Sequence, residues 1–76
     1  METRYFIGKT SERVFAVYRA DFDGKILKSQ EAWLLPNKNG WTSTNTVGDW
    51  YFEGDDNVWP VDRSEAEKYL PAKTIA

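Results

Sequence analysis

The stretch RADFDGKILKSQ, residues 19–30, has the length of a calcium-binding EF-hand loop and some of its residues. Such a loop takes oxygen ligands from its first, third, fifth, seventh, ninth and twelfth residues and has glycine at the sixth. Asp21 and Asp23 fall at the third and fifth places, and Gly24 falls at the sixth. This spacing makes the stretch a candidate metal site.

The two ends of the same stretch argue against calcium. Arg19 puts a cation where the first carboxylate belongs, and Gln30 puts a neutral amide where a bidentate glutamate would close the site. A β-hairpin explains the same residues, because Asp21 can accept backbone hydrogen bonds in a turn and Gly24 can adopt its left-handed conformation. We therefore predict a hairpin that pairs residues 14–19 with 25–30, and no metal site.

Enzymatic chemistry has little support in the sequence. The chain has no histidine and no cysteine, which removes Cys/His zinc sites, the Ser-His-Asp triad and the Cys-His dyad. Acidic residues gather in the second half, where they could hold a metal or mimic nucleic-acid charge, but so short a run is typical of a solvated loop. We expect no enzymatic activity and no cofactor. The acidic residues are Asp49, Glu53, Asp55, Asp56 and Asp62.

The alternative function is a small regulator that binds nucleic acid or mimics it. Binding is conceivable because basic and aromatic residues lie close together in the first half and could form a single-strand platform. Residues 1–43 carry seven Lys and Arg against five Asp and Glu, whereas residues 44–76 carry three against seven. The net charge is −2, and the acidic half would repel phosphates. The residues of this platform would be Arg4, Lys9, Arg13, Arg19, Lys25 and Lys28 with Tyr5, Phe15 and Tyr18.

Aromatic residues make up 16% of the chain, with four Trp, four Tyr and four Phe. So many rings exceed the needs of a core this small, so some must reach the surface, where Trp and Tyr supply much of the energy of protein interfaces. We expect a non-enzymatic module that binds another protein and is itself a monomer or a weak homodimer. The predicted partner-binding residues are Trp33, Trp50, Tyr51 and Trp59.

Short runs of β-branched and aromatic residues, separated by turn residues, predict the elements that position these rings. We expect an antiparallel meander sheet of three or four strands, drawn from residues 4–9, 14–19, 25–35 and 41–44. Residues 44–52 fit either a strand or a short helix. Residues 58–61 are expected to be extended, because Pro60 disfavours the helical conformation in Trp59 and cannot donate to a central ladder.

The end of the chain predicts a helix over residues 63–70. Asp62 followed by Glu65 resembles a capping pair, and Ala66, Tyr69 and Leu70 form one apolar stripe that should pack on a face of the sheet. The fold class is therefore α+β. The predicted core consists of Phe6, Phe15, Val17, Ile26, Leu34, Trp41, Phe52, Val61, Ala66, Tyr69 and Leu70.

The length of 76 residues suits one small domain, with an ordered core over residues 4–70 and a C-terminal tail over 71–76. No apolar run near the start suits a signal peptide, and no stretch approaches the length of a membrane span. We therefore expect a cytoplasmic protein with no membrane partner.

Four segments carry a resemblance to a known kind of protein. They are TRYF at residues 3–6, the step from Gly40 to Trp41, the acidic loop GDD at 54–56 and the closing VDRSEAEKYL at 61–70. In this layout the chain resembles short, single-domain actinobacterial proteins of unknown function. The resemblance implies a small cytoplasmic α+β domain and brings no catalytic residues with it.

Overall fold

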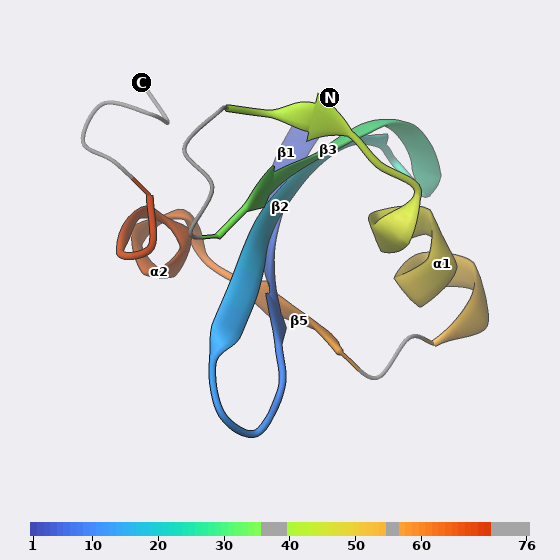
Figure 1. Cartoon of the computed structure of the whole chain (residues 1–76). Helices are drawn as coiled ribbons and strands as arrows, with labels where there is room; N and C mark the ends of the chain where they lie inside the picture. The colour runs from blue at the N-terminus through green and yellow to red at the C-terminus, as the bar shows by residue number, and fades with distance from the viewer. Residues whose placement is uncertain (36–39, 55–56, 71–76) are drawn as a thin grey trace.

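A computed structural model describes residues 1–35, 40–54 and 57–70 of the chain. These residues form an α+β fold with one sheet and two short helices (Figure 1). In chain order the elements are β1 (Glu2–Lys9), β2 (Val14–Asp23), β3 (Ile26–Leu34), β4 (Thr42–Ser43), α1 (Thr46–Glu53), β5 (Val58–Val61) and α2 (Arg63–Glu67).

The five described strands form an antiparallel sheet in the order β4-β3-β2-β1-β5. The first four follow the predicted meander, but β5 returns to pair with β1, so the expectation of three or four strands was too low. Lys9 donates its backbone N–H to the carbonyl of Asn57 at 3.0 Å. By alternation, odd-numbered residues of β1 direct their backbone groups toward β5. Pro60, which lies opposite Phe6, therefore turns its backbone outward, where a missing N–H costs no ladder bond.

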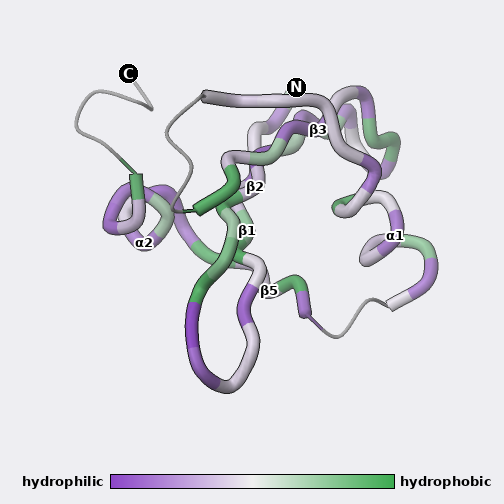
Figure 2. The backbone as a smooth tube through the Cα atoms, viewed as in Figure 1, coloured by the Kyte–Doolittle hydropathy of each residue, from purple (hydrophilic) through white to green (hydrophobic). Residues whose placement is uncertain are grey.

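Each face of the sheet is covered by one helix, α1 on one side and α2 on the other (Figure 1). Hydrophobic stretches of β1 and β2 lie between the helices, and the β1–β2 turn is hydrophilic (Figure 2). The α1-side cluster contains the buried residues Phe6, Ala16, Tyr18, Ala20, Phe22, Ala32, Val47 and Val58. The α2-side cluster contains Ile7, Val17, Trp33 and Ala66.

A β-bulge at the start of β2 changes which residues share a face. Gly8 lies opposite Ala16, but Lys9 lies opposite Val14, so Phe15 is the extra residue of the bulge. Phe15 consequently packs against the α1-side cluster, and Val14 packs against the α2-side cluster. Strict alternation along β2 would place Phe15 on the same face as Val17, and Val14 on the same face as Ala16. The inserted residue reverses this for Phe15 and Val14.

The predicted hairpin of β2 and β3 is confirmed, but the predicted pairing of residues 14–19 with 25–30 is wrong. The strands are longer and the turn lies later in the chain, so Arg19 pairs with Glu31 and Gln30 pairs with Ala20. Asp23 pairs with Ile26 across a two-residue turn at Gly24 and Lys25, and Gly24 has the left-handed φ of 62°. Asp21 lies within β2, away from that turn. Its carboxylate accepts hydrogen bonds from the hydroxyls of Thr3 at 2.6 Å and Ser29 at 3.1 Å, so its role is to link three strands.

Three residues of the predicted core lie at the surface. Ile26 is 59% exposed because it adjoins the β2–β3 turn, Leu34 is 50% exposed at the end of β3, and Phe52 is 74% exposed. In α1, Val47, Trp50 and Tyr51 face the sheet, which leaves Phe52 on the outer side of the helix. The buried members of the predicted core are Phe6, Val17 and Ala66, and the half-buried ones are Phe15, Trp41, Val61, Tyr69 and Leu70.

The structure resolves the choice between strand and helix for residues 44–52 in favour of a helix, α1. Its N-cap residue Asn45 makes no side-chain capping bond. The hydroxyl of Thr44 accepts the N–H of Thr46 at 3.2 Å, and the side-chain oxygen of Gln30 in β3 accepts the N–H of Gly48 at 3.0 Å. A side chain of the sheet therefore accepts one of the N–H groups at the start of α1, where the N-cap residue Asn45 makes no capping bond.

Some expectations fall outside the described residues: the acidic pair at 55–56 and the tail at 71–76. Among the helices of the described ranges, none has the length and apolarity needed to cross a membrane.

The bulge gives a prediction about Gly8. A Cβ at this position would lie 2.9 Å from ring atoms of Phe15 and 3.0 Å from the ring of Tyr18. We expect Gly8→Ala to lower the free energy of unfolding by about 1–3 kcal/mol through overpacking, as measured by urea denaturation. Phe15→Leu in the same chain should recover part of this loss, because it removes the nearest ring atoms. Additive effects of the two substitutions would contradict the proposed clash.

Candidate functional site

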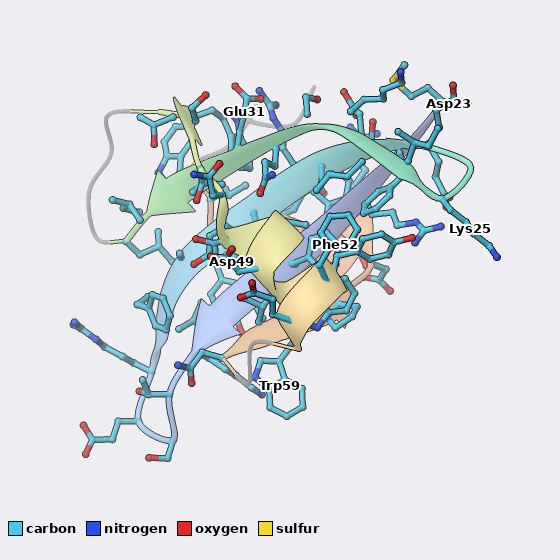
Figure 3. All side chains as sticks on the ribbon, turned by 90° about the vertical axis from the view of Figure 1, so that its right-hand side faces the viewer. Asp23, Lys25, Glu31, Asp49, Phe52 and Trp59 are labelled. Atoms are coloured by element: carbon cyan, nitrogen blue, oxygen red, sulfur yellow. The ribbon has the colours of Figure 1, made fainter. Side chains whose placement is uncertain are left out.

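Trp59, on the edge strand β5, is the most exposed of the four tryptophans. It is 49% exposed, whereas Trp33 is only 9% exposed and Trp41 and Trp50 are half-buried. Figure 3 shows Trp59 and Phe52 projecting from different elements, β5 and α1, at separate places on the molecule. A functional site that uses an exposed indole therefore has to be built around Trp59.

Trp33, one of the predicted partner-binding residues, belongs to the interior. It forms part of the α2-side cluster, and the ring of Trp41 packs edge-on against it at 5.7 Å between centroids. The guanidinium of Arg19 in turn covers Trp41 at 4.1 Å from the ring centroid and is paired with Glu31 at 2.7 Å. Burial under this stack removes Trp33 from the surface, which corrects the prediction.

Trp50 and Tyr51 fasten α1 to the sheet and are half-buried. The ring of Trp50 lies 4.9 Å from Phe6, and the ring of Tyr51 meets Phe22 edge-on at 5.2 Å. The hydroxyl of Tyr51 also donates to the carbonyl of Lys25 at 3.0 Å. Both rings therefore pack α1 against the sheet. The structure does not bring either of them together with Trp59.

A groove of about 570 Å³ runs between the β1–β2 hairpin and α2, with Trp59 on one wall. Its apolar side chains belong to the α2 side of the sheet, because Trp59 pairs with Ile7 and Val61 pairs with Tyr5. The groove, called the hairpin–helix groove below, is lined by Ile7, Lys9, Thr10, Ser11, Glu12, Arg13, Val14, Trp59, Pro60, Val61, Glu65 and Tyr69.

The rim on the hairpin side is positively charged and held in place by the backbone. Thr10 donates its N–H to the carbonyl of Arg13 at 2.9 Å, which closes the turn between β1 and β2. The ammonium of Lys9 lies 5.1 Å from the centroid of the Trp59 ring, a cation–π contact worth about 0.5–1 kcal/mol at an exposed site. This contact joins the side chains of β1 and β5 beside the groove.

The opposite wall is α2 and the turn that follows it. The helix ends at Glu67, three residues before the predicted end, and Tyr69 and Leu70 pack from the turn rather than from the helix. Asp62 caps the helix as predicted, because its carboxylate accepts the N–H of Glu65 at 2.8 Å. That backbone hydrogen bond, followed by one from the Ser64 hydroxyl, lowers the pKa of Asp62 below its ordinary value of 3.8.

The basic residues that suggested a nucleic-acid platform lie in different parts of the fold. Arg4 pairs with Glu2 at 3.1 Å, Arg19 stacks on Trp41, and Lys25 lies at the β2–β3 turn. Tyr18 of the same set is buried. Only Lys9 and Arg13 of these cations line the groove beside Trp59.

Sequence reasoning selected Trp59 by residue type but missed its neighbours Lys9, Arg13 and Tyr69 as parts of one site. These residues converge only because β5 pairs with β1. The available sequence signal was Trp59-Pro60, since proline within an extended run indicates an edge strand with an accessible side.

Searches against protein-family models, curated proteins and solved structures found no match to this chain. The resemblance to short actinobacterial proteins, and the cytoplasmic location that it implies, therefore stay predictions.

The cap of α2 gives a prediction about pH. Because the folded-state pKa of Asp62 is lowered, its carboxylate contributes stability that is present above the ordinary value of 3.8 and is lost as the pH falls through the folded value. We expect the urea midpoint of the wild-type protein to exceed that of Asp62→Asn near about pH 6, and the gap to narrow by about pH 3. A gap that stays constant between these pH values would contradict the assignment.

Proposed function

We propose that this protein is a non-enzymatic interaction module that binds another protein through the hairpin–helix groove, with Trp59 as its anchor. The observation that carries this proposal is the 49% exposure of Trp59 beside a groove with apolar lining. A tryptophan that is half out of water retains much of its apolar area for burial against a partner, and Trp, Tyr and Arg are the residues that most often dominate interface energies.

The composition of the groove supports a binding role. Ile7, Val14 and Val61 supply apolar lining, and Tyr69 lines the groove from the α2 side. Charged residues lie at the rim, as in protein interfaces with an apolar centre and a polar border. The absence of His and Cys from the chain leaves few of the side chains on which acid–base or nucleophilic catalysis usually depends.

The fold supplies a rigid base for this surface. Ile7 lies in β1, which is paired on both sides by β2 and β5, and it is only 4% exposed. Trp59 is attached to β1 through the same ladder. A partner would therefore meet a preformed groove and would pay little ordering entropy on the side of this protein.

Phe52 provides a matched control, because it is a larger exposed apolar surface on a different element. We expect Trp59→Ala to reduce the yield of a specifically captured partner from a lysate of the source organism by about tenfold or more. Phe52→Ala should leave that yield unchanged. Quantitative mass spectrometry measures the yield, and thermal unfolding confirms that both variants are folded. Equal capture by wild type and Trp59→Ala, or loss with Phe52→Ala instead, would refute the proposal.

A further inference from the structure

The charges beside Trp59 are not neutralised within the groove. Among the four arginines of the chain, Arg4, Arg19 and Arg63 each form an ion pair with a glutamate, at 3.1, 2.7 and 3.1 Å respectively. Within the described residues, neither Arg13 nor Lys9 lies within ion-pair distance of a carboxylate. Two cations on the hairpin rim of the groove are therefore available to a ligand.

The acids of the same groove do not cancel this charge. The carboxylate of Glu65 already has partners on the α2 side of the groove. It accepts hydrogen bonds from the ammonium of Lys68 at 3.1 Å and from the hydroxyl of Tyr69 at 3.5 Å. Glu12 lies exposed in the turn, and its backbone N–H is bonded to the Thr10 hydroxyl at 3.4 Å. The hairpin rim therefore keeps a net positive charge on a chain whose net charge is −2.

The charge pattern distinguishes this groove from another hollow of similar size. A space of about 600 Å³ beside Trp50 is also lined by arginines, Arg4 and Arg63. Both of these arginines are already paired, with Glu2 and Glu67. Only the hairpin–helix groove combines an exposed indole with cations that lack a carboxylate partner in the described part of the chain.

We propose that the hairpin–helix groove binds an extended, acidic segment of the partner protein. An apolar side chain of that segment packs between Trp59 and Tyr69, and its carboxylates lie over Lys9 and Arg13. An extended chain suits a groove bounded by a hairpin and a helix, because alternate side chains point to the floor and to the rim. This inference rests on the proposed function and specifies the chemistry of the partner.

The test uses two short fluorescent peptides, one of alternating leucine and aspartate and one of alternating leucine and lysine. We expect the aspartate peptide to bind the full chain and to shift the NMR signals of the Trp59 indole N–H and of Ile7 and Val14. The lysine peptide should bind about tenfold more weakly, since like charges then meet at the rim.

Charge reversal provides the decisive comparison. Lys9→Glu with Arg13→Glu should weaken binding of the aspartate peptide by about tenfold and should strengthen binding of the lysine peptide. Lys25→Glu with Lys28→Glu changes the net charge by the same amount at the β2–β3 turn and should change binding by less than about twofold, because these residues lie outside the groove.

Three outcomes would overturn the inference. Equal weakening by the two charge-reversed pairs would show a general charge effect, and peptide-induced shifts confined to other residues would place the ligand elsewhere. A concentration-dependent dimer that is lost in Trp59→Ala would make a second copy of this chain the occupant. If capture of the natural partner needs Trp59 but tolerates reversal of Lys9 and Arg13, the interaction function stands and the acidic partner is wrong.

Discussion

The alternation of side chains along β1 is the constraint on which the rest of this structure depends. Phe6 points into the α1-side cluster and its neighbour Ile7 into the α2-side cluster, so one strand contributes to both hydrophobic layers. Because β1 is paired with β2 on one side and β5 on the other, both layers are tied to the same register. The register of β1 thereby also fixes the groove, since Trp59 lies opposite Ile7.

Local sequence signals predicted the elements whose determinants are close in the chain. The hairpin of β2 and β3 follows from Gly24 and the strand-forming residues on both sides of it, and the start of α2 follows from the capping side chain of Asp62. Neither needs information from a distant segment. Signals of this kind could not show the bulge at Phe15, because a bulge is a relation between two strands and Phe15 itself is an ordinary strand residue.

The candidate site was only partly predictable for the same reason. Residue type alone predicted Trp33, Trp50 and Trp59 alike as partner-binding residues. The exposure of each ring depends instead on which side chains pack against it in the folded protein. Trp41 and Ala66 belong to the layer that buries Trp33, whereas Trp59 lies in β5, which pairs with one strand alone, β1, among the described strands. The meeting of Lys9 with Trp59 spans fifty residues of sequence. A contact between residues so far apart in the chain can be predicted only when the pairing of β1 with β5 is known.

The bond from Gln30 to the N-terminus of α1 has a consequence for the order of folding. A helix of eight residues is too short to persist alone in water, and α1 lacks a side-chain cap from Asn45. Its missing acceptor is on β3, so the amide of Gly48 gains a partner only after that strand is in place. We therefore expect α1 to form after the sheet, and its hydrogen-exchange protection to be governed by openings of β3 rather than by fraying of the helix. The sheet thus supplies both the hydrogen-bond acceptor and the apolar surface that α1 needs in order to form.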